Sequence, residues 1–268
     1  MKTLRLLTLI AMIAMFGFTS CQKDVEGEVT ANEISPLTMA KISAMGFNTD
    51  NVQRTEGGYI VEGDIFFSDS DLNASPETLA LRVGEEEQYR TNNLVSVGSS
   101  RTIRVAITTS LPSSYVTALD EAIRRFNAEN LRLKFQRVSS SYNILVSKAP
   151  SGANYLASAG FPSGGNPYNS IVMNSDYLGS NPGTNYLATI MAHEIGHTIG
   201  FRHTDYMNRA YSCGGSFYNE GASTVGAVHI PGTPTGADPN SWMLACIGTG
   251  VNRNFNANDR TALRYLYQ

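Results

Sequence analysis

Three of the four histidines of this 268-residue chain lie close together, at positions 193, 197 and 203. On a helix, His193 and His197 project from the same face one turn apart. Glu194 is placed to take a proton from a metal-bound water without ligating the metal. Gly200 can adopt the left-handed conformation that ends a helix, so His203 can return as a third ligand. Three nitrogen ligands leave a fourth position for water, which indicates a catalytic rather than a structural Zn²⁺ site.

The residues around this motif favour a helix over about residues 185–200. Apolar side chains recur every fourth residue beside the histidine face, at Leu187, Met191, Ile195 and Ile199. Such a helix packs its apolar stripe on a core and presents its ligands to a cleft. A bare His-Glu-x-x-His pattern also occurs in ordinary helices with exposed histidines. Here the added glycine and third histidine favour the metal site.

The pattern from about residue 101 onward predicts an α+β domain. Ile103, Val105 and Ile107 alternate with less apolar residues, as in a strand. A helix is expected after Pro112, and residues 131–136 alternate as the next strand. Further strands are expected over residues 142–146, 155–161 and 170–173, and a last helix over residues 257–267.

Two sequence features resemble the metzincin metallopeptidases. Residues 193–203 carry the extended zinc motif of that group, and the letters HEIGH at 193–197 resemble the dual-action HEIGH metallopeptidases. Ser241-Trp242-Met243 resembles the metzincin turn that places a methionine, here Met243, beneath the metal. The chain departs from some metzincins at Ala245, where a tyrosine would help to stabilise an oxyanion.

The resemblance implies a metzincin-like catalytic domain over residues 101–268, with a mixed twisted sheet, a backing helix, a zinc-site helix and a C-terminal helix. It implies an edge strand at residues 155–161 that binds extended peptide by adding it to the sheet. The expected function is that of a zinc-dependent endopeptidase acting on protein or peptide substrates, with Glu194 as general base. One catalytic Zn²⁺ is expected. A Ca²⁺ ion is compatible with the chain, but no motif indicates a site for one.

Two other functions compete with the endopeptidase reading. One is a surface binding lipoprotein whose zinc is structural, although such a site has no need of Glu194. The other is a zinc amidase acting on small substrates. Asp205 is either a partner of the ligands or a turn residue, and the turn is preferred. The fourth histidine, His229, is expected to lie in a loop away from the metal.

The N-terminus predicts export. Lys2 and Arg5 lead into an apolar run over residues 6–18 that is too short to span a membrane and typical of a secretory signal. The following Phe-Thr-Ser-Cys21 resembles a bacterial lipobox, so residues 1–20 are interpreted as a lipoprotein signal peptide and Cys21 as the lipidated residue. The alternative is an ordinary signal peptide with a coincidental cysteine. Residues 22–26 are either a tag for the outer membrane or cell surface, or a charged tether.

Composition narrows the remaining partners. A net charge of −3 without a basic cluster argues against nucleic acid, and no second apolar run is long enough to cross a bilayer. The exported chain is expected to be a monomer attached to the membrane through lipid on Cys21. Cys213 and Cys246 would remain, either joined as a disulfide in an oxidising compartment or as two buried thiols.

Residues 21–100 have a different character and are predicted to form a tether and pro-segment. They are polar, with a short helix expected over residues 38–47, an extended stretch over residues 57–67 and an acidic run at residues 85–87. Val61-Glu62-Gly63-Asp64 is similar to the Phe-x-Gly-Asp stretch of astacin pro-segments, in which the aspartate occupies the open zinc position. Asp64 is therefore either a latency ligand or an acidic residue at a strand end. A cysteine-based latency device is excluded, because no cysteine lies between Cys21 and Cys213.

Overall fold

The computed structural model describes residues 34–73, 88–234 and 236–268. The predicted signal peptide, the lipidated Cys21, the charged residues 22–26 and the acidic run at 85–87 lie outside these ranges. Among the described helices, none has the length and hydropathy needed to cross a bilayer.

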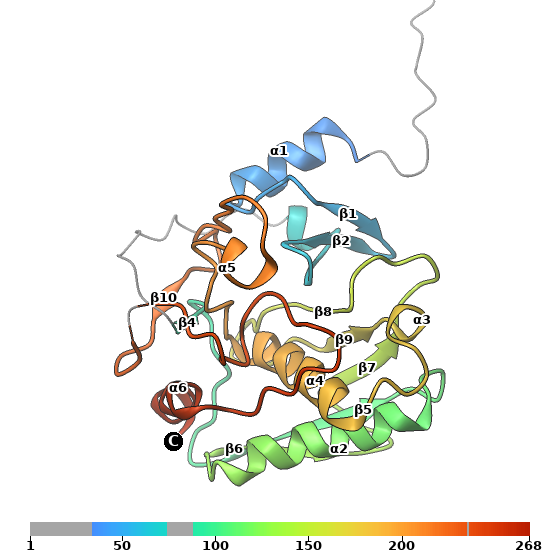
Figure 1. The fold of residues 1–268 in the computed structure, drawn as a ribbon, viewed down its shortest axis with the longest axis vertical. Helices are drawn as coiled ribbons and strands as arrows, with labels where there is room; N and C mark the ends of the chain where they lie inside the picture. Colours follow the sequence, from blue (N-terminus) through green and yellow to red (C-terminus); the bar gives the residue numbers. More distant parts are fainter. Residues whose placement is uncertain (1–33, 74–87, 235) are drawn as a thin grey trace, which may run out of the picture. The chain divides into compact units, whose positions relative to one another are not determined.

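A mixed sheet of eight strands forms the framework (Figure 1). In spatial order the strands are β1 (Gln53–Thr55), β2 (Gly58–Val61), β3 (Ile65–Ser68), β8 (Ala157–Ala159), β9 (Ser170–Met173), β7 (Ile144–Lys148), β5 (Arg101–Ile107) and β6 (Leu133–Arg137). Strands β9, β7, β5 and β6 run parallel to one another, whereas β8 is antiparallel to β9.

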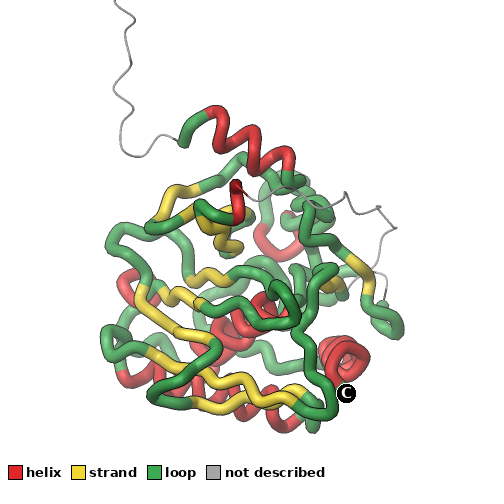
Figure 2. Tube along the Cα trace, turned by 180° about the vertical axis from the view of Figure 1, so that it is seen from behind, coloured by secondary structure: helices red, strands yellow, loops and turns green. Residues whose placement is uncertain are grey.

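Two long helices, α2 (Ser113–Ala128) and α4 (Thr184–Ile199), cover one face of this sheet. Figure 1 shows them in front of the strands, and Figure 2 shows the strands in front when the molecule is turned round. Leu119 and Phe126 of α2 are fully buried in the core that α4 also joins, as their spacing predicted. The C-terminal helix α6 (Ala257–Tyr267) begins at a capping box formed by Asn256 and Asp259. These elements confirm the predicted α+β architecture.

Shorter elements connect this framework. They are α1 (Pro36–Ala44), the 3₁₀ turn η1 (Asp71–Asn73), α3 (Ser175–Leu178), α5 (Ala210–Cys213), and the two-stranded sheet of β4 (Tyr89–Arg90) and β10 (Val228–His229). Ser35 caps α1 by accepting a hydrogen bond from the backbone N–H of Thr38.

The prediction that residues 155–161 form an edge strand is wrong for the chain as it folds here. The strand is limited to β8 and lies between β9 and β3. Ile65 of β3 pairs with Ala159, whose backbone N–H donates to the carbonyl oxygen of Asp64 at 3.0 Å. The periodicity of β8 could not reveal this neighbour, because β3 comes from a segment about ninety residues earlier. Without β1–β3, β8 would form the edge.

Residues 34–73 have a small apolar core of their own. It consists of Ile42, Phe47, Val61, Ile65, Phe67 and Leu72, and Phe161 and Val225 from the later chain pack against it. Residues 88–95 pack instead with the later part of the chain. Tyr89 and Val95 are buried, and Arg90 forms a β-bridge with Phe201, just after α4. The domain boundary at residue 101 stays a prediction, and these contacts favour an earlier one.

Candidate metal centre and active site

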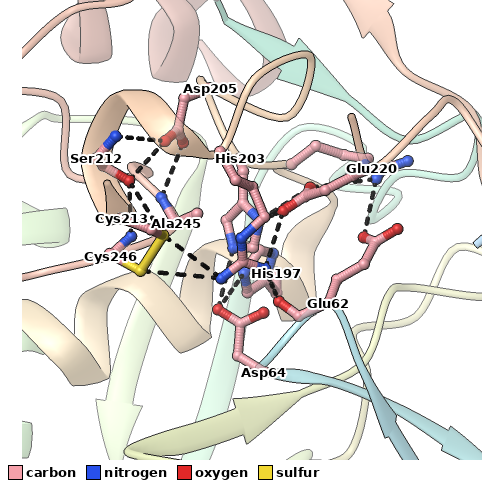
Figure 3. A network of polar contacts seen from close by, with 12 residues as sticks. Glu62, Asp64, His197, His203, Asp205, Ser212, Cys213, Glu220, Ala245 and Cys246 are labelled. Carbon is pink, nitrogen blue, oxygen red and sulfur yellow. Dashed lines mark hydrogen bonds and ion pairs between the residues drawn. A yellow bond between two sulfur atoms is a disulfide. The ribbon is translucent and has the colours of Figure 1, made fainter. Parts of the chain in front are cut away.

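Helix α4 places the first two histidines, and its end places the third. Gly200 has a φ of 113°, and its N–H donates to the carbonyl oxygens of Gly196 and His197, which ends the helix. The chain reverses there, so that His203 returns to face the ring of His197 with 4.9 Å between ring centroids (Figure 3). All three histidines are buried.

Each imidazole is oriented by an acceptor at its Nδ1 atom. His193 Nδ1 donates to the carbonyl oxygen of Trp242 at 3.0 Å, and His197 Nδ1 donates to that of Phe201 at 2.9 Å. His203 Nδ1 lies 2.8 and 3.0 Å from the two carboxylate oxygens of Glu220. Because carbonyls and carboxylates only accept, these contacts put a proton on each Nδ1 and turn the Nε2 atoms toward one another.

The three Nε2 atoms converge on a point that suits a cation. His193 Nε2 and His197 Nε2 lie 2.9 Å apart, and one ligand atom from each histidine and from Asp64 lies within 4.8 Å of the others. Two lone pairs at such a distance repel unless a positive charge lies between them. Tetrahedral zinc with bonds of about 2.0–2.1 Å needs ligand atoms roughly 3.3 Å apart. The donor set therefore fits Zn²⁺, and it forms a zinc-binding site of three histidines and one aspartate.

Burial and nearby charges shift the pKa values of the histidine ligands in opposite directions. Burial lowers the pKa of His197 to about 4, so this ring stays neutral at physiological pH. For His203 burial acts in the same direction, but the carboxylates of Asp64 and Glu220 outweigh it and raise the pKa above its usual value. A metal that binds His203 must therefore displace a proton.

Asp64 reaches the histidines from the loop between β2 and β3. Glu62 and Gly63 have positive φ values of 53° and 90°, and this tight loop points Asp64 into the site. Asp64 Oδ2 lies 3.0 Å from His203 Nε2, 3.4 Å from His193 Nε2 and 3.8 Å from His197 Nε2. Burial would raise the pKa of Asp64, but the three imidazoles lower it well below its usual value.

A buried charge network surrounds the third ligand, and sequence reasoning missed it. Glu220 accepts from His203 and also pairs with Arg202 at 3.6 Å and Arg209 at 3.1 Å. Arg202 pairs with the Glu62 carboxylate at 3.2 Å, and Arg209 donates to the Glu62 carbonyl oxygen. The network therefore joins the loop that carries Asp64 to the loop after α4. No motif marks Glu220, which lies in an irregular segment.

Glu194 lies beside the metal ligands and lines a cavity with His193 and Asp64. Its side chain is buried, and its Oε2 atom has no hydrogen-bond partner among the described residues. Burial, together with the nearby Asp64 charge, raises the pKa of Glu194 well above its usual value. A buried carboxyl group that borders a cavity beside the metal ligands is suited to general acid–base chemistry.

Met243 lies directly beneath the zinc helix, in the turn that the sequence indicated. A Cβ atom at Gly196 would come within 2.6 Å of Met243 Sδ and of the Trp242 ring, so an alanine here would force these side chains to shift. Asp259 of α6 fixes the turn by accepting from the Ser241 hydroxyl and the Trp242 N–H. The backbone N–H of Thr204, next to the third ligand, donates to the Met243 carbonyl oxygen at 2.9 Å.

The remaining candidates from the sequence lie outside the ligand set. Cys213 and Cys246 form a disulfide that joins the loop after His203 to the segment after Met243. Asp205 accepts from the Ser212 hydroxyl and the Ala245 N–H (Figure 3). Among the described residues it forms no hydrogen bond with an imidazole. It organises the two loops, as the turn interpretation expected. His229 lies in β10, where its Nε2 is 3.0 Å from the Thr233 hydroxyl.

Three buried histidines with oriented rings, a neighbouring glutamate and a methionine turn define a zinc-dependent metalloendopeptidase site, that of a hydrolase. The family comparison agrees, because residues 59–267 match the model of the dual-action HEIGH metallo-peptidases. The chain belongs to this family. The match begins before Asp64, so it includes the loop that reaches the zinc site.

Comparison with solved structures finds similar chains of low sequence identity. High choriolytic enzyme 1, a hatching-enzyme zinc protease from the medaka fish Oryzias latipes, is 16% identical, with a TM-score of 0.39 over 65% of this chain and 93% of that one. A structure of myroilysin is 14% identical, with a TM-score of 0.44 over 65% of this chain and 96% of that one. No curated protein matches the chain.

Proposed function

We propose that the chain is an exported, lipid-anchored zinc endopeptidase made in a latent form, with Glu194 as its general base. The observation that carries this proposal is the convergence of three oriented Nε2 atoms beside the buried Glu194, whose Oε2 atom has no partner among the described residues. A zinc ion bound there supplies Lewis acidity, which polarises a peptide carbonyl and lowers the pKa of water. His193, His197 and His203 would hold the ion.

Each side chain of the site has a separate role in hydrolysis. Glu194, which borders the cavity beside His193, accepts the proton of the attacking water and delivers it to the departing amine. Met243 and Trp242 support the helix from below and fix the carbonyl that orients His193. Once β3 has moved away, β8 becomes the edge of the sheet, and its backbone binds extended peptide.

Asp64 would keep this site latent. Its carboxylate lies against all three ligand nitrogens, the position that an incoming water or peptide needs. The same segment covers β8 through β3, and Arg202 and Arg209 bind Glu62 two residues before Asp64. Removal of residues 34–73 would expose both the three ligand nitrogens and the peptide-binding edge of β8.

One observation favours a second function. Three histidines and Asp64 make four protein ligands, which is the closed coordination of a structural zinc site. In that case the chain would be a surface lipoprotein that binds other molecules without cleaving them. A structural site has no use for a buried glutamate without a hydrogen-bond partner beside the metal, so we prefer the latent peptidase.

Replacement of Asp64 separates the two functions. We expect the zinc-loaded Asp64→Ala chain to cleave casein faster than the unprocessed wild type, and a chelator to stop the reaction. Asp69→Ala, which removes a surface partner of Arg54 in the same segment, is the matched control and should leave cleavage unchanged. An Asp64→Ala chain that holds zinc but cleaves nothing, even after proteolytic removal of residues 34–73 has freed β8, would favour the structural site.

Glu194→Gln tests the general base. Added to Asp64→Ala, it should abolish casein cleavage while one zinc per chain stays bound, because Glu194 takes no part in the ligand cluster. Undiminished cleavage by the double variant would refute the role of Glu194.

Export and lipid anchoring rest on the N-terminal sequence alone. Mass spectrometry of the mature N-terminus should find diacylglycerol on Cys21. An N-terminus without lipid would support the ordinary signal peptide instead.

A further inference from the structure

A cavity of about 240 Å³ opens beside Glu194 and His193. Helix α4 contributes Ile190, and the segment after the methionine turn contributes Leu244 and Ile247. Because Glu194 borders the cavity, a peptide whose bond lies at this carboxylate places a neighbouring side chain inside it. These three side chains are apolar, but the lining also includes two arginines, Arg209 and Arg253.

Arg253 supplies positive charge from a fixed position. Its backbone N–H donates to the Thr189 hydroxyl at 3.0 Å, one helical turn before His193, and its carbonyl oxygen accepts from Arg125 at 3.3 Å. Its Nη1 atom donates to the carbonyl oxygen of Cys246 at 2.9 Å. The side chain is therefore held between the zinc helix and the segment after the methionine turn.

Within the described ranges, no ion pair joins the guanidinium of Arg253 to a carboxylate. The two acids that line the cavity are Asp64, which faces the histidines, and Glu194. Arg209, the second cation of the lining, already pairs with Glu220. Partial burial lowers the pKa of Arg253, although the charges of Asp205 and Asp259, neither of which forms an ion pair with it, act in the opposite direction.

We propose that this cavity is the subsite for the substrate side chain next to the cleaved bond, and that Arg253 selects an acidic side chain there. The inference rests on the proposed peptidase function and names its substrate class. Ile190, Leu244 and Ile247 contact the methylene groups of a glutamate, while Arg253 binds its carboxylate through charge-assisted hydrogen bonds. A glutamine forms weaker bonds, and a lysine is repelled by Arg253.

A binding measurement tests this subsite without relying on turnover. The probes are four hydroxamate-capped peptides that differ only in the first side chain after the hydroxamate, which is Glu, Gln, Leu or Lys. Calorimetry on the zinc-loaded full-length Asp64→Ala chain should find the Glu peptide bound at least about tenfold more tightly than the Gln peptide.

Variants of Arg253 identify the residue responsible. Arg253→Met should bring the Glu-to-Gln affinity ratio close to one, and Arg253→Lys should retain part of it. Arg260→Met, which removes a surface arginine paired with Glu129, is the matched control and should keep the full ratio. The ratio compares two peptides on one variant, so a smaller folded fraction does not alter it.

Two results would overturn the inference. One is an equal affinity of the Asp64→Ala chain for the Glu and Gln peptides, which leaves the peptidase function intact. The other is an unchanged ratio in Arg253→Met. Failure of all four peptides to bind the zinc-loaded chain, both with residues 34–73 present and after their proteolytic removal, would instead contradict the proposed function, and the subsite with it.

Discussion

Removal of the Glu220 charge should weaken zinc binding, although Glu220 is not itself a ligand. Both Glu220 oxygens accept from His203 Nδ1, at 2.8 and 3.0 Å, and the Glu220 side chain is 0% exposed. The other two rings are oriented by backbone carbonyls, which this change leaves in place. Loss of such a partner typically reduces metal affinity about 10- to 100-fold, or roughly 1.4–2.7 kcal/mol.

Two substitutions grade the effect. Glu220→Gln keeps an acceptor oxygen and loses the charge, so we expect about a tenfold loss of zinc affinity, near the lower limit. Glu220→Ala also removes the carboxylate that Arg209 and Arg202 share, and it should lower the free energy of unfolding by about 3–5 kcal/mol. Competition with a chromophoric chelator measures the affinity, and urea unfolding measures the stability.

The matched control is Glu129→Gln. Glu129 also joins two arginines, Arg260 and Arg264, which lie at the surface. Among the described residues it forms no hydrogen bond with the three histidines. It should leave zinc affinity unchanged. If Glu220→Gln binds zinc as tightly as the wild type, Glu220 does not orient His203 in solution and the reasoning fails.

Three further perturbations test the support around the site. Gly196→Ala should lower the free energy of unfolding by about 1–3 kcal/mol through overpacking against the methionine turn, whereas Gly236→Ala meets no atom within 4 Å and should leave urea unfolding unchanged; equal effects would contradict the close contact. Replacing Cys213 and Cys246 by serine opens a loop of 33 residues and should reduce stability by roughly 3–4 kcal/mol, and an unchanged melting temperature would argue against a native disulfide. Burial raises the pKa of Asp259 to about 6 from an unfolded value near 4, so the stability from this group is present below pH 4 and lost as pH rises through 6. Relative to Asp259→Asn, the wild type should lose up to about 3 kcal/mol between pH 4 and 7 in urea unfolding, and parallel pH curves would refute this.

Local patterns predicted the parts of the structure that depend on local contacts. The alternation of β5 and the spacing of α2 gave both elements nearly at their observed bounds. The zinc helix and its glycine end could be predicted because their residues lie within a few turns of one another. The predicted apolar stripe was too narrow, since residues 186–199 are all buried. The methionine turn and the loop carrying Asp64 cover the other faces of this helix.

Contacts between distant segments could not be predicted in the same way. The pairing of β3 with β8 and the ion pair of Glu62 with Arg202 join residues that are far apart in sequence. Glu220 lies in an irregular loop, so no periodicity places its carboxylate beside His203. Arg253 likewise depends on how the segment after the methionine turn folds back on α4. Such groups become recognisable only when the tertiary structure shows their partners.

Zinc K-edge X-ray absorption on the purified full-length chain tests the central claim most directly. The structure predicts one zinc per chain, bound by three imidazole nitrogens, from His193, His197 and His203, and by one carboxylate oxygen, from Asp64. Asp64→Ala should keep the three imidazoles and exchange the carboxylate for water. A chain without stoichiometric zinc, or a spectrum with fewer than three imidazole ligands, would contradict the account.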